Sequence, residues 1–270
     1  GSPTSRWEVD GYARDRHRLA IWPGTPPGEY TLLIGVYDVT SGRQLAVRDA
    51  GGAPLGTTFS LTSVAVTRPS SLPEAEDVAV THEIRADLTE NLQLLGFDPP
   101  PEGVDVGGRL PLTLYWHALA PPVEDYEARL SLVAPDGTTV AAGQAVPGRV
   151  SYPTSAWQGG DVVRDGRSLL VPARVPGGEY TLSVDLFSRA GDPVGGSVDL
   201  MNVSVRVPER SFDAPPVQHS VSATLGNQAT LLGYDLSDES VSSGQSFTVT
   251  LYWRAEATTE TRTIAFVHLL

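Results

Sequence analysis

The stretch RLPLTLYW at residues 109–116 decides the fold, because apolar and polar side chains alternate along it. Leu110, Leu112 and Leu114 fall on one face, which is the period of a half-buried β-strand. The pattern returns as SFTVTLYW at 246–253, where the Leu-Tyr-Trp ending of 114–116 recurs at 251–253. We therefore expect a repeated unit built from strands.

Other matches extend this repeat in both directions. We call the numbering difference between Trp116 and Trp253 the front offset. The same difference relates Leu-Leu-Gly-Phe-Asp at 94–98 to Leu-Leu-Gly-Tyr-Asp at 231–235. Pro-Thr-Ser-x-Trp at 3–7 and Gly-Glu-Tyr-Thr-Leu at 28–32 return at 153–157 and 178–182, by a displacement that we call the back offset. The matches divide the chain into the back half of a unit (1–68), a linker (69–83), a complete unit (84–208), a linker (209–220) and the front half of a third unit (221–270).

Turn residues and short strands indicate the fold class. The chain has 27 Gly and 22 Pro among 270 residues, and they punctuate Val-, Thr- and Tyr-rich runs. This pattern is typical of antiparallel two-sheet sandwiches. Tyr30 and Tyr180 each follow a Gly-Glu corner, as in the tyrosine corner of immunoglobulin-like domains. The sequence predicts an all-β chain of tandem immunoglobulin-like antiparallel β-sandwiches, one complete and two partial, with about eight strands per unit.

Composition excludes several functions. The net charge is −13 and all 19 basic residues are Arg, which argues against nucleic acid and anionic membrane surfaces as partners. No apolar run approaches the length of a membrane-spanning helix, so we expect no membrane insertion by this segment. The absence of Cys excludes a disulfide framework. A single Met and three Asn also suit a thermophile.

The repeated motifs carry a family resemblance. Leu-Leu-Gly-Tyr-Asp at 231–235, Thr-Leu-Tyr-Trp at 250–253, Phe-Val-His-Leu-Leu at 266–270 and Gly-Val-Tyr-Asp at 35–38 are the residues concerned. In these the chain resembles the extracytoplasmic β-sandwich modules of Chloroflexota-type surface proteins, some of which also have a mannosyltransferase-like membrane region. The resemblance implies an extracellular or cell-surface module without catalysis of its own.

Residues suited to catalysis or metal binding are few. The five His are far apart, and no nucleophile elbow or phosphate loop occurs, so we expect no enzyme activity and no cofactor. Asp235, Asp238 and Glu239 share one loop and are the candidate calcium ligands, since hard cations take several oxygens. Asp15 and Asp165 share a repeat position, where they are expected to accept backbone hydrogen bonds that brace the neighbouring Trp loop.

Tryptophans offer the candidate binding residues. Trp7 and Trp157 lie at equivalent positions in Pro-Ser loops, where an exposed ring would stack on the apolar face of a glycan. The alternative is that these rings fill the sandwich core or clamp its corner. In each Tyr-Trp pair the two rings should point to opposite faces of the strand, one of them into the core.

The partial units predict assembly. A half-sandwich exposes strand edges and an apolar face, and these invite a further chain. We expect self-association, or contact with adjacent repeats of the same protein, with a ring or a filament as the product. Three alternatives remain open: a fragment of a longer array, a carbohydrate-binding module, and a regulatory ectodomain of a membrane glycosyltransferase.

Overall fold

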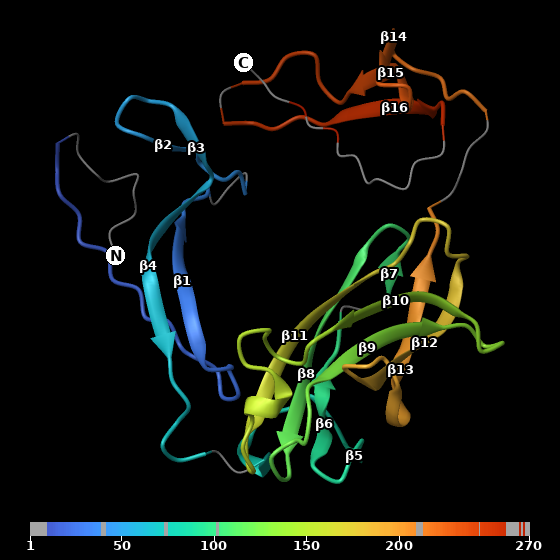
Figure 1. Cartoon of the computed structure of the whole chain (residues 1–270). Helices are drawn as coiled ribbons and strands as arrows, with labels where there is room; N and C mark the ends of the chain where they lie inside the picture. Colours follow the sequence, from blue (N-terminus) through green and yellow to red (C-terminus); the bar gives the residue numbers. More distant parts are fainter. Residues whose placement is uncertain are drawn as a thin grey trace.

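The chain is built from β-strands, as its sequence predicts. A computed structural model describes residues 10–38, 42–72, 75–100, 103–208, 213–242, 244–257, 265 and 267. In this part of the chain the strands form antiparallel sheets, and the only helices are short 3-10 turns, among them η2 (Ala75–Asp77) and η3 (Thr154–Ala156) (Figure 1). None of the described helices has the length and apolar character needed to cross a membrane.

The complete unit is a sandwich of two facing sheets (Figure 1). One sheet has the strand order β10-β9-β12-β13-β7 and the other β11-β8-β6-β5. All pairings are antiparallel except the short one between β13 and β7. The strands are β5 (His82–Asp87), β6 (Leu92–Asp98), β7 (Val104–Asp105), β8 (Arg109–Ala118), β9 (Tyr126–Val133), β10 (Thr139–Ala145), β11 (Val162–Leu170), β12 (Gly178–Ser188) and β13 (Pro193–Arg206).

Both sheets contribute to one core between them. Leu110, Leu112, Leu114 and Trp116 point inward from β8, which confirms the predicted alternation. They pack with inward residues of the facing sheet, such as Leu182. Burying side chains of this size stabilises the fold by about 1.5–3 kcal/mol each, so this core is what holds the unit together.

The outer face of β8 is covered by a segment predicted to be a linker. Tyr115 points away from the core, as expected beside Trp116, yet it is buried in a second cluster with Val78, Leu95 and Val162. Val78 belongs to the 69–83 segment, which therefore packs on the sheet instead of being wholly a solvated spacer.

The first partial unit repeats a hairpin of the complete one. β1 (Gly28–Gly35) pairs with β4 (Thr58–Val66), and β2 (Val47–Arg48) with β3 (Pro54–Gly56). Tyr30 faces Val64 just as Tyr180 faces Val203, and both hairpins shift register at the same place, after Leu32 and Leu182. We call residues 10–68 the first half-unit.

The tyrosine corner occurs in both hairpins. The Tyr30 hydroxyl donates to the Pro26 carbonyl (2.7 Å), and the Tyr180 hydroxyl donates to the Pro176 carbonyl (2.8 Å). Each bond ties the start of the strand to the corner that precedes it. Both hydroxyls therefore make a bond of the kind that a tyrosine corner makes.

The last partial unit repeats the other sheet. β14 (His219–Leu225), β15 (Ala229–Leu236) and β16 (Val249–Ala255) form a three-stranded sheet in the order of β5, β6 and β8. A side chain at Gly96 would collide with the carbonyl oxygen of His82, and one at Gly233 with that of His219. The repeated Leu-Leu-Gly-aromatic-Asp motif thus keeps its Gly because the neighbouring strand passes too close for a Cβ. We call residues 213–257 the last half-unit.

Some elements differ from the prediction. The complete unit has nine strands instead of about eight, and the first, β5, begins at His82 inside the predicted linker. The apolar run at 169–172 predicts a strand there, but β11 begins earlier, at Val162, because it pairs with β8 along its whole length. Residues 264–269 match the pattern of 129–134 and so predict a further strand, but only 265 and 267 of them are described.

Candidate interaction surface

A buried polar contact joins β8 to β11 in the complete unit. The indole Nε1 of Trp116 donates to Oδ2 of Asp165 (3.0 Å), and Nε of Arg167 lies 2.7 Å from the same oxygen. All three side chains are buried. A buried carboxylate needs such partners, because leaving it unpaired would cost several kcal/mol. The contact therefore favours one register of β8 against β11.

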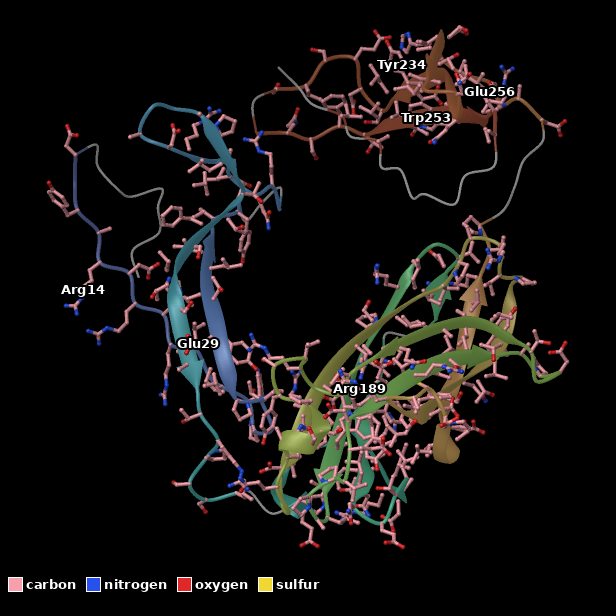
Figure 2. The ribbon with its side chains drawn as sticks, in the orientation of Figure 1. Arg14, Glu29, Arg189, Tyr234, Trp253 and Glu256 are labelled. Carbon is pink, nitrogen blue, oxygen red and sulfur yellow. The ribbon has the colours of Figure 1, made fainter. Side chains whose placement is uncertain are left out.

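The members of this contact are separated in the half-units. By the back offset, Asp165 and Arg167 correspond to Asp15 and His17, whose side chains lie 2.8 Å apart. The front offset carries Trp116 onto Trp253. Trp253 is 39% exposed, whereas Trp116 is fully buried. Figure 2 shows Trp253 on the sheet of the last half-unit and Arg14, beside Asp15 in the sequence, on the segment before β1.

The segment before β1 forms no strand, although its counterpart does. Residues 12–20 correspond to β11, residues 162–170, and every one of them is exposed. Leu19 is 67% exposed where Leu169 is 2% exposed, and Ile21 is 59% exposed where Val171 is fully buried. The backbone of this segment pairs with no strand among the described residues.

The inward face of the first hairpin is also uncovered. Its large apolar side chains sit where the complete unit places core residues, with Val64 at the position of the buried Val203. Three exposed residues have buried core counterparts of this kind in β12 and β13: Ile34, Val36 and Val64. The half-units therefore expose the residues that form a core when both halves are present.

A second repeated contact joins β6 to β8 in the complete unit and β15 to β16 in the last half-unit. The Tyr115 hydroxyl donates to Asp98 (2.7 Å) and the Tyr252 hydroxyl donates to Asp235 (2.6 Å). His82 stacks on Phe97 in one copy, and His219 stacks on Tyr234 in the other. Neither histidine was singled out from the sequence, although the front offset carries one onto the other.

Hydrogen bonds set the protonation of these groups. Burial raises the pKa of Asp98, but bonds from Thr81 and Tyr115 outweigh it and the pKa lies below its ordinary value. A backbone hydrogen bond from Gln218, followed by that from Tyr252, lowers the pKa of Asp235. Both carboxyls are therefore ionised acceptors near neutral pH, and each ties its Tyr-bearing strand to the neighbouring one.

Arginines join the first half-unit to the complete unit. The Arg149 guanidinium lies over the Tyr30 ring, 4.2 Å from its centroid, and donates to the Glu29 carbonyl (2.5 Å). The Arg164 amide donates to the Gly24 carbonyl (2.7 Å). We call this set of contacts the joint; it fixes the corner of the first hairpin against β11.

A shallow groove of about 530 Å³ lies beside the joint. Trp22 lines it and is 66% exposed, and Thr25, Thr67 and Ser71 add hydroxyl groups. The Trp22 carbonyl accepts from the Thr25 hydroxyl (2.7 Å), which orders the turn. The counterpart of Trp22 in the complete unit is Pro172, so the repeat does not require an aromatic ring here.

The predicted glycan-stacking residues do not line this groove. Trp157 is buried in the core and its Nε1 donates to the Tyr152 carbonyl (3.1 Å), so its ring has no face free for a sugar. The prediction that Trp157 is exposed for glycan stacking is therefore wrong, and its ring is part of the sandwich core. Trp7 lies outside the described residues.

The carboxylate that braces the Trp157 loop is Asp161. It accepts from the Gln158 amide (2.9 Å) and the Tyr152 hydroxyl (2.8 Å), and Arg68 lies 2.7 Å away. Asp165, expected in this role, instead accepts from side chains on β8 and β11, because it points into the sandwich. The sequence did not indicate Asp161, since its counterpart in the first copy is Gly11.

The candidate calcium ligands are not brought together. Asp235 is bound by Tyr252 and Gln218, and Asp238 accepts from the Ser237 hydroxyl (3.0 Å). Glu239 is exposed beside them. Within the described ranges, no three His, Cys, Asp or Glu side chains are grouped closely enough to hold a metal ion.

Comparisons with known proteins give matches among solved structures only. No protein-family model matches the chain, and no curated protein matches its sequence. Among solved structures, the chain is similar to the C-terminal domain of Wzt. The identity is 13% and the TM-score 0.34, over 50% of this chain and 86% of that one.

Proposed function

We propose that the protein is a non-catalytic β-sandwich repeat whose function is assembly. In this role each exposed half-unit face is covered by a complementary half-unit, which rebuilds the sandwich seen in residues 84–208. The complete unit then acts as a rigid spacer between two such connections. A location outside the cell, at its surface, follows from the resemblance to exported modules.

The observation that carries this proposal is the burial of matching positions. Leu169, Val171 and Trp116 are buried in the complete unit, and their counterparts Leu19, Ile21 and Trp253 are exposed in the half-units. An apolar surface of this kind in a soluble protein marks an interaction site. The complete unit contains both halves in contact, and this supports the proposal that the two exposed half-unit surfaces are complementary.

Sedimentation over a range of concentrations tests the proposal. The 28.7 kDa chain is expected to form larger species as its concentration rises. Leu19→Asp places a charge where the covered unit has a buried leucine, so it should abolish this association. The matched control is Val150→Asp, because Val150 is an exposed apolar residue of the complete unit. A chain that stays monomeric at all concentrations, or an equal effect of both variants, would refute assembly.

The groove at Trp22 favours a second candidate function, carbohydrate binding. An exposed indole ring beside hydroxyl groups suits the apolar and polar faces of a sugar. Titration with a panel of glycans should quench tryptophan fluorescence in the native chain and not in Trp22→Ala. Trp253→Ala is the matched control, because that ring is exposed outside the groove.

A further inference from the structure

We propose that residues 12–20 of one chain pair with β16 of a second copy, in the register that joins β11 to β8. In this arrangement the Trp253 indole donates to Asp15 across the interface. The inference deepens the proposed function, on which it rests, by naming the partner and the way the two strands align.

The complete unit supplies the register. Val163 faces Trp116 and Gly166 faces Thr113 in the antiparallel pairing of β11 with β8. The back and front offsets turn these pairs into Ala13 facing Trp253 and Arg16 facing Thr250. A shift of one residue would turn the apolar side chains of the segment to the other face. In this register Leu19 and Trp253 enter the same core, as Leu169 and Trp116 do in the complete unit.

Side chains beyond the Trp–Asp pair also fit this register. Arg164 reaches the Thr113 hydroxyl (3.4 Å), and its charge acts on Tyr115 and Asp98. Arg14 holds the place of Arg164, and Thr250 holds the place of Thr113. The interface would therefore bring the Arg14 guanidinium close to the Tyr252–Asp235 pair, where the Asp235 carboxylate carries the opposite charge.

Charge complementarity supports a second copy as the partner. Residues 12–20 hold three Arg and one Asp, a net charge of +2 with His neutral, in a chain whose net charge is −13. Residues 213–257 hold one Arg and five acidic residues, a net charge of −4. Opposite charges on the two surfaces attract, and like charges elsewhere oppose other encounters.

The geometry of the surfaces leads to head-to-tail growth. Each chain carries one basic segment and one acidic sheet, and no strand of β1–β4 pairs with β14–β16 among the described residues. The contact is heterologous, since the two surfaces differ. Such contacts repeat from chain to chain until a ring closes or a filament grows.

Cysteine trapping tests the register directly, because the chain has no Cys of its own. Arg16→Cys with Thr250→Cys places two thiols at facing positions, where Cα atoms lie about 4.5–5.5 Å apart, a distance that a disulfide can bridge. Mild oxidation with oxidised glutathione should then give a ladder of linked chains on a non-reducing gel. Arg16→Cys with Thr248→Cys is the matched control, shifted by two residues, and should give no ladder.

Each outcome of the trapping decides one claim. Association without a ladder overturns the register and leaves the proposed function standing. A linked monomer of faster migration shows that one chain closes on itself, which overturns the second copy as partner. A chain that neither associates nor links overturns the inference and the proposed function together.

A double-mutant cycle tests the Trp253–Asp15 contact. Asp15→Ala and Trp253→Phe should each weaken self-association by about 10- to 100-fold, as expected for a buried hydrogen bond to a charge. The double variant should be no weaker than either single one, because both changes remove the same bond. Asp10→Ala is the control and should leave association unchanged. Additive losses would show that the two residues do not meet.

Discussion

The complete unit and the two half-units are built from the same motifs but differ in what those motifs contact. Trp116 and Asp165 meet in the complete unit, whereas Trp253 and Asp15 lie in separate half-units. The Tyr–Asp contact, in contrast, forms at both Tyr115 and Tyr252. A contact therefore survives when both of its strands lie in the same half-unit, and it is absent when its strands lie in different half-units.

This difference separates two kinds of sequence information. The Leu-Leu-Gly-aromatic-Asp motif specifies one sheet and needs no second sheet to form it. The alternation of β8 specifies a core, and a core needs a second apolar surface. A half-unit therefore has well-defined strands and an unfinished interior.

The largest effect is expected from the paired tryptophans. Trp116→Ala removes a fully buried ring and should lower the free energy of unfolding of the complete unit by about 3–5 kcal/mol. Trp253→Ala, measured below the concentration at which chains associate, should leave that transition nearly unchanged. Urea denaturation followed by circular dichroism measures both. Equal losses would mean that Trp253 is already buried in the isolated chain.

The joint should show the next largest effect. Arg149→Ala removes the cation over Tyr30, an interaction worth about 0.5–2 kcal/mol. Exchange at the Arg164 amide, which donates to Gly24, should become faster as the first half-unit detaches. Arg189→Ala is the control, because its side chain is 84% exposed and lies 3.8 Å from Asp125. Unchanged exchange in Arg149→Ala would show that other contacts hold the joint.

The tyrosine corners should respond differently in the two regions. Tyr180→Phe removes the bond to Pro176 and should lower the free energy of unfolding of the complete unit by about 0.5–1.5 kcal/mol. Tyr30→Phe should leave that transition unchanged and instead speed hydrogen exchange in β1. If both variants shift the same unfolding transition, the first half-unit and the complete unit fold as one cooperative body.

Acid should produce the smallest effect. The pKa of Asp98 is lower in the folded chain than its ordinary value of 3.8, so its contribution to stability is present above that pH. It is lost as the pH falls through the lowered pKa, and solvent screening of this half-buried group keeps it small. Denaturation midpoints between pH 6 and pH 3 should therefore fall less in Asp98→Asn than in the native chain. Parallel curves would exclude Asp98 as a source of the acid sensitivity.

Much of the fold was predictable because each strand motif occurs twice, so that one copy supports the interpretation of the other. The alternation of 109–116 predicted β8, and the two Gly-Glu-Tyr corners predicted β1 and β12 to within two residues of their observed starts. β5 was missed, since its residues 82–87 contain four polar side chains and only Ile84 stands out as apolar. Its place is set by pairing with β6, a tertiary contact. The assignment to immunoglobulin-like tandem domains stays a prediction.

The candidate sites were predicted less well than the fold. Asp15 and Asp165 were singled out by their shared position in the repeat. The partner of Asp165, however, is Trp116, which lies on another strand 49 positions earlier in the chain. Trp22 was missed because nothing in the repeat matches it. Whether a tryptophan ring fills the core or binds a ligand depends on its exposure to solvent. The exposure of Trp157 depends on contacts between strands that are distant in the sequence, so the sequence pattern alone did not determine it.

Trp116 and Asp165 are 49 positions apart in the chain, and this separation has a consequence for folding kinetics. In the complete unit these partners find each other within one chain, at a rate set by loop closure and independent of protein concentration. In a unit formed from two chains, the same step is a bimolecular collision whose rate rises with concentration. The sandwich would thus close early in residues 84–208, while the composite sandwich would close only as fast as chains accumulate.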